Sequence, residues 1–188
     1  IHTELTRAFC KGHNIKYKMW SLKECEELIC EHYPEYIELW SEFRHPIQQC
    51  DFIRYLILHR FGGIYVDCDI YPIKPLTDLL KDDLLFVCWN NDLQKKPYNA
   101  IMGSKPLNDL FIRICNDIID RVEEKQSMTI YETWVGRLVF QTTGHHMLKH
   151  HVPKSSIKDI MFIQNKEKNI IVKSDNPYFM DSNISSWF

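Results

Sequence analysis

The sequence predicts an α/β layer fold in which helices flank a central, mostly parallel β-sheet. Short apolar segments with strand character alternate with longer helical segments along the chain, and turn signals separate them. With 188 residues and 45% hydrophobic residues, the chain is long enough for one well-buried core and too short for two comfortable domains. We therefore expect a single domain over residues 1–188.

The first part of the chain is expected to hold one strand and two helices. Residues 15–20 alternate enough to form a strand. Ser21 and Glu24 have the spacing of a capping box, which predicts a helix from this point to about residue 32. A second helix is expected over 34–43, because a proline is well suited to the first turn of a helix.

A third helix is expected over 47–61. It is apolar on nearly every side, except for a stripe that carries Gln48, Asp51 and Arg54. This pattern indicates a buried helix with one polar face. Gly62 is expected to end the helix, since glycine readily adopts the left-handed conformation found after many helices.

The rest of the chain shows shorter elements around one long helix. The continuous apolar run at 84–89 is typical of a central parallel strand. The expected strands lie over 64–67, 84–89 and 98–104 and near 160–163 and 170–172; the expected helices lie over 76–80 and 106–125, with two further helical stretches within 131–151.

Two carboxylates, Asp67 and Asp69, follow the strand expected over 64–67. An isolated Asp-x-Asp pair often arises by chance and then forms a solvated turn. Here strand alternation places Tyr65 and both aspartates on one side, at the end of a strand where α/β folds bind ligands. Like charges this close require a cation, and Mg²⁺ or Mn²⁺ prefers carboxylate and phosphate oxygens. The pattern indicates a divalent metal site suited to the departure of a nucleotide diphosphate.

Asp51 and Arg54 have i, i+3 spacing on the third helix, and two interpretations remain open. They can form a structural ion pair. Alternatively, they can face a polar cavity, because an otherwise apolar helix tolerates such charges poorly. In a cavity, an acid and a guanidinium could hold sugar hydroxyls.

Composition excludes several classes of partner. The formal net charge of −2 gives no basic footprint, so neither nucleic acid nor an anionic membrane surface is the expected partner. No apolar run reaches the roughly 18 residues needed to cross a bilayer. We expect a soluble chain, in the cytoplasm or, if an anchor lies elsewhere in the protein, in the Golgi lumen.

The seven scattered cysteines show no C-x-x-C spacing, which indicates reduced thiols.

Residues 51–69 carry the pattern Asp-x-x-Arg-Tyr-x-x-Leu, then Gly-Gly-Ile-Tyr-x-Asp-x-Asp. This pattern closely resembles the DXD-containing sugar-binding region of glycosyltransferase family 32, which includes the yeast initiating mannosyltransferases, and of the related large clostridial glucosylating toxins. Further segments similar to the family lie at 17–20, 33–34, 99–104, 143–144 and 185–187.

The resemblance implies a GT-A type, Rossmann-like nucleotide-sugar-binding fold. It also implies a retaining transfer from a UDP- or GDP-sugar to a carbohydrate, glycolipid or glycoprotein acceptor, assisted by Mn²⁺ or Mg²⁺. By position, the catalytic pair would be Asp67 and Asp69. In the implied site, Asp69 binds the metal, and Asp67 contacts the ribose or donor sugar and assists through water. Asp51 and Arg54 hold sugar hydroxyls, Tyr65 packs near the nucleotide, and Asn99 touches the sugar or its leaving oxygen. Ser185 and Trp187 close over the diphosphate, and Asp181 or Ser185 is a further candidate metal ligand.

The sequence departs from the family pattern on the nucleotide side and on the acceptor side, and two alternative functions stay open. The N-terminal strand region is short or incomplete, and His145 replaces the proline that usually follows Thr-Gly. The first alternative is an inactive or weakly active nucleotide-sugar-binding module of a larger assembly. The second is a metal-dependent hydrolase of nucleotide sugars.

Overall fold

The computed structural model contains two compact units. It describes residues 2–76, 78–81, 83–88, 97–126, 139, 142–145, 147–158, 163–166, 169–172 and 178–181. Unit 1 comprises Ile1–Lys18, Gly63–Ser104 and Val152–Phe188, and unit 2 comprises Met19–Gly62 and Lys105–His151. The single domain expected from the sequence stays a prediction.

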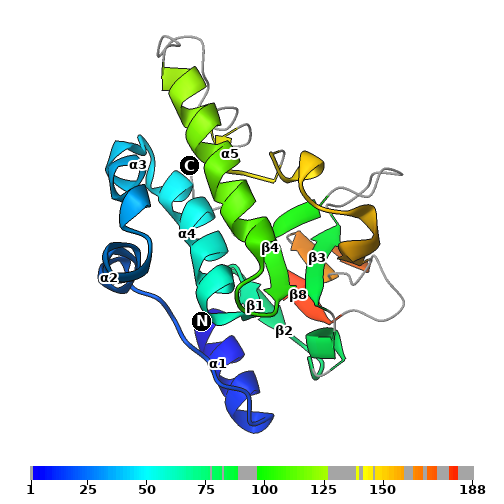
Figure 1. Ribbon diagram of the computed structural model, residues 1–188. Helices are drawn as coiled ribbons and strands as arrows, with labels where there is room; N and C mark the ends of the chain where they lie inside the picture. Colours follow the sequence, from blue (N-terminus) through cyan, green and yellow to red (C-terminus); the bar gives the residue numbers. More distant parts are fainter. Residues whose placement is uncertain are drawn as a thin grey trace. The chain divides into compact units, whose positions relative to one another are not determined.

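Unit 1 contains a four-stranded sheet built around β4 (Pro97–Ser104). Strand β4 pairs antiparallel with β1 (Gly63–Val66) and with β3 (Leu84–Cys88), and β3 pairs parallel with β5 (Ile157–Lys158). The order is β1-β4-β3-β5; β1, β4 and β3 are labelled in Figure 1. Strand β4 therefore links the strand that precedes Asp67 to the rest of the sheet.

A second sheet in unit 1 has the order β2-β8-β6-β7. Strand β8 (Phe179–Asp181) pairs antiparallel with β2 (Ile70–Pro72) and parallel with β6 (Ile163–Lys166), which in turn pairs antiparallel with β7 (Asn169–Val172). Strand β7 matches the strand expected near 170–172, whereas β6 overlaps the strand expected near 160–163 only at Ile163, and β2 was not expected.

The α/β class is confirmed, but a mostly parallel sheet is not. Among the described strands, only the pairs β3–β5 and β6–β8 are parallel. The apolar run at 84–88 forms β3, which has a partner on each side. Such a run reports burial on both faces of the sheet and carries no information on strand direction.

The N-terminal region differs from the expectation. Residues 15–20 form no strand, and several of their side chains are exposed. Helix α1 (His2–Gly12) precedes them and packs against β2. The sequence pattern that marks this helix is the i, i+3, i+4 spacing of Thr6, Phe9 and Cys10. These three side chains are less exposed than those between them.

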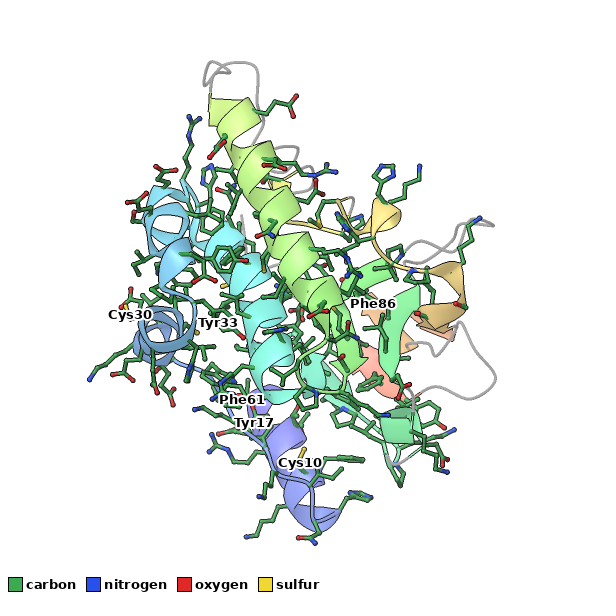
Figure 2. The ribbon with its side chains drawn as sticks, viewed as in Figure 1. Cys10, Tyr17, Cys30, Tyr33, Phe61 and Phe86 are labelled. Atoms are coloured by element: carbon green, nitrogen blue, oxygen red, sulfur yellow. The ribbon has the colours of Figure 1, made fainter. Side chains whose placement is uncertain are left out.

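The core of unit 1 draws buried side chains from β2, β3, β4 and β8, and Phe9 of α1 packs against them. Phe86 of β3, which is labelled in Figure 2, is also fully buried. Burial of such aromatic and aliphatic side chains is the main force that holds the strands together. A cluster of buried side chains comprises Ile70, Leu76, Leu79, Leu85, Ala100, Ile101 and Phe179.

Unit 2 is helical. Helix α2 (Leu22–His32) is followed by a 3₁₀ turn and by α3 (Ile37–Glu42), and α4 (Pro46–Phe61) packs against α5 (Asp109–Gln126) (Figure 1). The helices expected over 22–32, 34–43 and 47–61 are thus confirmed. Gly62 follows α4 with a φ of 64°, as expected for the residue that ends the helix.

The remaining helices begin or end differently from the expectation. Helix α5 begins after Asn108, because the Asn108 Oδ1 accepts a hydrogen bond from the Leu110 N–H at 3.0 Å and caps the helix. The short helix expected over 76–80 is a 3₁₀ turn at Leu79–Lys81. Within 131–151, Met147–His150 is also a 3₁₀ helix, while 131–138 lie outside the described residues. Residues 160–162, part of an expected strand, lie outside them as well.

The capping box at the start of α2 is fully formed. The Glu24 N–H donates to Ser21 Oγ at 3.3 Å, and the Ser21 N–H donates to Glu24 Oε2 at 2.9 Å. Replacing Ser21 with Ala is expected to lower the free energy of unfolding by about 1 kcal/mol, since it leaves a helix N–H without its acceptor. Urea denaturation measures this loss. The matched control is Ser41→Ala, whose hydroxyl donates to Glu38 O within α3; a loss as large in the control would contradict the capping role.

His59 makes the stability of unit 2 sensitive to acid. Burial lowers the pKa of His59 below its ordinary value of 6.5, and its Nδ1 lies 2.6 Å from the Tyr33 hydroxyl. The unfolded chain therefore binds a proton that the folded chain does not. Stability is expected to fall as the pH drops below about 6.5 and to be unaffected by this group above it. Unfolding curves at several pH values test this, with His59→Gln expected to show a flatter profile. Identical profiles would exclude His59 as the source.

Candidate functional site

Asp67 and Asp69 lie on one tight turn between β1 and β2. The Asp67 N–H donates to Ala100 O at 2.9 Å, which extends the pairing of β1 with β4 by one residue. The Ile70 N–H donates to Asp67 O at 3.0 Å and closes a four-residue turn. Both carboxylates are therefore presented from a short segment that is fixed by a paired strand on each side.

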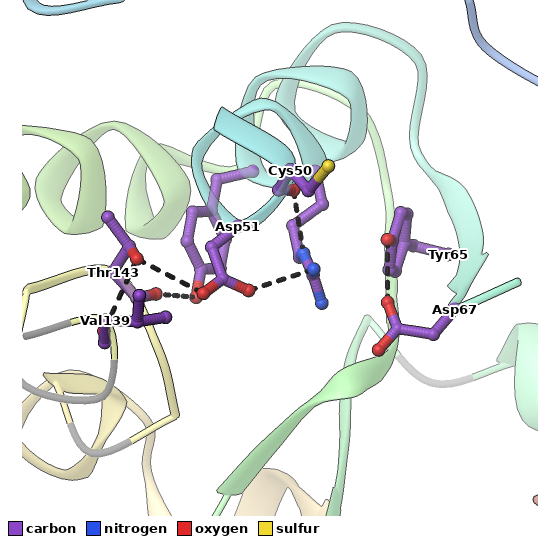
Figure 3. Close-up of polar contacts among 8 residues, drawn as sticks. Cys50, Asp51, Tyr65, Asp67, Val139 and Thr143 are labelled. Atoms are coloured by element: carbon purple, nitrogen blue, oxygen red, sulfur yellow. Dashed lines mark hydrogen bonds and ion pairs between the residues drawn. The ribbon is translucent and has the colours of Figure 1, made fainter. Parts of the chain in front are cut away.

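Tyr65 orients the first of these carboxylates. Its hydroxyl donates a hydrogen bond of 2.8 Å to Asp67 Oδ1 (Figure 3). The expectation that Tyr65 and Asp67 share one side of the strand is thus confirmed. Asp69 lies in the turn, so strand alternation does not determine its direction. Because the tyrosine hydroxyl is neutral, it fixes the Asp67 carboxylate and leaves its negative charge in place.

Two residues distant in sequence are brought to this turn by strand pairing. Asn99 precedes Ala100 in β4 and is buried. The backbone of Asp181 in β8 lies opposite Ile70, the residue that follows Asp69. The sequence-based prediction therefore named residues whose backbones flank the turn.

The predicted metal ligands are represented in part. The carboxylates of Asp67 and Asp69 are of the hard oxygen type that Mg²⁺ and Mn²⁺ prefer, and a metal held by them would keep coordination positions open for a diphosphate. Ser185, Trp187 and the side chain of Asp181 lie outside the described part of the chain. Among the side chains that the structure describes, no group of three His, Cys, Asp or Glu residues could hold a metal.

The N-terminal segment also reaches this turn, a contribution that the sequence analysis missed. Thr6 Oγ1 donates to Ile70 O at 3.4 Å, and the Arg7 guanidinium lies 6.0 Å from the centre of the Tyr17 ring. The pKa of Tyr17 is raised, mainly by burial and further by the neighbouring Cys68. Cys68 separates the two aspartates, so Tyr17 belongs to the surroundings of the turn.

Asp51 and Arg54 form a buried ion pair on α4 in unit 2. Arg54 Nη2 lies 2.9 Å from Asp51 Oδ1, and Arg54 Nε donates to Cys50 O at 3.0 Å. The other carboxylate oxygen, Asp51 Oδ2, accepts a hydrogen bond of 3.2 Å from Thr143 Oγ1 (Figure 3). The polar face predicted for this helix is therefore a hydrogen-bonded network.

This network fits the structural ion-pair interpretation that the sequence left open. Asp51 and Arg54 are each only 2% exposed, and charges at such depth must be paired and hydrogen-bonded. Thr143, to which the sequence analysis assigned no role beyond a family resemblance, is the third member of the network. The contact of Asp51 and Arg54 with a donor sugar stays a prediction.

Comparison with known proteins finds a matching family over part of the chain. Residues 6–86 match the family described as "Glycosyltransferase sugar-binding region containing DXD motif". The match includes the Asp67 turn and the Asp51–Arg54 pair. Over these residues, which are less than half of the chain, the protein is similar to the DXD-containing glycosyltransferases. An uncharacterized glycosyltransferase of Acanthamoeba polyphaga mimivirus is 25% identical over 94% of this chain and 72% of the viral protein.

The similarity to fungal proteins covers a shorter region. A mannosyl phosphorylinositol ceramide synthase of Saccharomyces cerevisiae is 33% identical over 52% of this chain and 25% of the yeast protein. An initiation-specific alpha-1,6-mannosyltransferase of Candida albicans is 31% identical over 38% of this chain and 20% of that protein. The chain thus spans a quarter or less of these two relatives. No helix in the described residues is long and apolar enough to cross a membrane.

Proposed function

We propose that this protein transfers a sugar from a nucleoside diphosphate sugar to an acceptor, with a divalent metal and with retention of the anomeric configuration. The observation that carries the proposal is the turn at Asp67 and Asp69, held by Tyr65 and by β4, within a region that matches the family. The GT-A fold is part of this proposal.

The proposed chemistry assigns a separate task to each residue around the turn. A bound Mn²⁺ or Mg²⁺ would neutralise charge on the departing diphosphate. Asp69 would hold the metal, and Asp67, oriented by Tyr65, would contact the donor. Asn99 would bind the donor sugar. Holding the donor in one orientation lowers the barrier, because less motion has to be frozen during the reaction.

We further propose a mannosyl donor and a lipid-linked acceptor as the first pair to test. The printed names of fungal relatives include mannosyl phosphorylinositol ceramide synthase and inositol phosphoceramide mannosyltransferase. UDP-glucose, UDP-galactose and UDP-N-acetylglucosamine are the alternatives to GDP-mannose.

A thermal-shift screen against UDP- and GDP-sugars, with and without Mn²⁺, tests the proposal. A ligand at 100 times its dissociation constant adds about 2.7 kcal/mol to stability, which is readily detected. We expect a shift that requires both Mn²⁺ and one donor, and an α-linked product from an α-linked donor in an NMR assay of transfer. The absence of a shift with every donor, free UDP and free GDP included, would contradict the proposal.

Two outcomes would favour the alternatives. Metal-dependent nucleotide binding without turnover of any donor would favour the inactive or weakly active module. Hydrolysis that does not accelerate when acceptors are added would favour the nucleotide-sugar hydrolase.

Tyr65 provides a mild test of the orientation of Asp67. The variant Tyr65→Phe removes the hydroxyl that donates to Asp67 Oδ1 while it keeps the ring. We expect the catalytic rate to fall about tenfold, because an active-site group loses a fixed orientation, and the melting temperature to change little. The control is Tyr71→Phe, whose hydroxyl donates to the Met180 sulfur in the same unit. Equal rates for Tyr65→Phe and the wild type would exclude the orienting role.

A further inference from the structure

Exposed apolar side chains gather in unit 2 around the C-terminal end of α4. Phe61 is the last residue of α4 and is labelled in Figure 2. It is 52% exposed, and its ring centre lies 5.4 Å from that of Trp20. The neighbours of Trp20 in sequence, Met19 and Leu22, are 41% and 60% exposed. Exposed apolar residues are common singly, whereas a group of them calls for an explanation.

Leu107 joins this group from the turn that precedes α5. Its N–H donates to His59 O at 2.6 Å, which fixes it beside the last turn of α4. It is 66% exposed, the largest value among the exposed large apolar side chains of the described residues. Its φ is 58°. After Pro106, this position of a turn normally holds Gly or Asn.

The backbone conformation of Leu107 is unfavourable for leucine, whereas Asn or Gly could make the same N–H bond to His59 O without that strain. A leucine in the left-handed region is strained, and an exposed apolar side chain gains nothing from water. Asn or Gly at this position would relieve the strain. Retention of strain is typical of a position with a function outside the fold itself.

Basic residues accompany the apolar ones. Arg60 precedes Phe61 and its guanidinium lies 5.9 Å from the centre of the Phe61 ring, while Lys105 is exposed two positions before Leu107. Lys23 follows Leu22 and pairs with Glu27 at 3.6 Å, with both side chains mostly exposed. Exposed pairs of this kind are weak, so Lys23 remains able to approach an anion.

We propose that this patch, formed by Met19, Trp20, Leu22, Phe61 and Leu107 with Arg60 and Lys105, docks on the surface of a phospholipid membrane. Trp, Phe and Leu side chains enter the boundary between headgroups and acyl chains, and adjacent Arg and Lys bind lipid phosphates. The net charge of −2 argues against a broad basic surface. The net charge is a sum over the whole chain, whereas docking by inserted apolar side chains and adjacent cations depends only on the residues of the patch.

Vesicle flotation tests the proposal without any sugar donor or acceptor, so its result is independent of the proposed function. The probes are vesicles of phosphatidylcholine alone and of phosphatidylcholine with phosphatidylserine. We expect the wild-type chain to float with both, and more strongly with the anionic vesicles. The double variant Leu22→Ser/Phe61→Ser is expected to bind at least about tenfold more weakly, since two inserting side chains are lost.

Two further variants separate docking from folding. Leu5→Ser changes an apolar side chain that is 44% exposed on α1 in unit 1, and it is expected to float like the wild type. Leu107→Asn is expected to keep or raise the melting temperature, because Asn tolerates the left-handed conformation, and yet to weaken flotation. Reduced binding by a more stable protein cannot come from misfolding.

The other outcomes would overturn the proposal. If the wild type does not float with either kind of vesicle, or if the patch variants and Leu5→Ser float equally well, the patch does not dock on membranes. If sedimentation instead shows a dimer that Leu107→Asn dissociates, the patch binds a second copy of the chain.

Discussion

Replacing Asp69 with Ala is expected to abolish Mn²⁺-dependent donor binding and to leave the fold intact. Asp69 lies on a turn that is closed by backbone hydrogen bonds of Asp67 and Ile70, and Asp69→Ala leaves these backbone bonds in place. Removing one of two neighbouring negative charges also relieves repulsion. The stabilisation of about 2.7 kcal/mol expected from a donor at 100 times its dissociation constant should vanish, while the melting temperature without ligand should change little.

The control for this experiment is another acid of unit 1. Asp78 forms an exposed salt bridge of 2.9 Å with Lys81 and has no place in the proposed site. Asp78→Ala should retain the full donor-induced shift. If Asp69→Ala also retained it, Asp69 would be removed from the metal site, and a different set of ligands would be needed. Titration with Mn²⁺ alone then distinguishes loss of the metal from loss of the donor.

Local signals in the sequence predicted local structure well. The spacing of Ser21 and Glu24 predicted the start of α2, and the apolar pattern with its polar stripe predicted α4 and its end at Gly62. These features are decided by residues within one or two turns of each other. The strand before Asp67 was also predicted from a local signal, the alternating run of residues that precedes the two aspartates.

Features that depend on distant partners were predicted poorly. The segment 15–20 alternates like a strand, yet alternation alone supplies no partner for its backbone. The run that forms β3 is buried on both faces, and this burial is the same for parallel and antiparallel neighbours. Only the register of the sheets reveals that β8 lies beside β2, which brings the backbone of Asp181 opposite Ile70.

The site shows the same division. The sequence singled out Asp51 and Arg54 and left open whether they form an ion pair or face a cavity. The geometry adds Thr143, far away in the chain, as the donor to the second carboxylate oxygen. No local pattern could assign that contact, because it depends on how the segment after α5 returns to α4.

The ion pair of unit 2 carries the second large prediction. Arg54→Met is expected to lower the free energy of unfolding by about 3–5 kcal/mol, because it leaves the Asp51 carboxylate buried without its countercharge. Chemical denaturation measures the loss. The matched control is Arg121→Met on α5, where Arg121 lies 2.8 Å from Asp117 and both side chains are more than a quarter exposed. A pair in contact with water should contribute less than about 1 kcal/mol. Equal losses in the two variants would contradict a stabilising role for the buried pair.

A double variant then separates stability from donor binding. Asp51→Leu/Arg54→Met removes both charges, so neither remains buried without a partner, and Thr143 Oγ1 can still donate to Val139 O at 3.4 Å. We expect the double variant to be more stable than Arg54→Met, because replacing a whole buried ion pair with apolar side chains is often neutral or favourable. If Asp51 and Arg54 also hold the donor sugar, the folded double variant loses its donor-induced thermal shift and keeps its response to free nucleotide with Mn²⁺. If the pair serves only the fold, both responses persist, and the polar stripe of α4 has a purely structural origin.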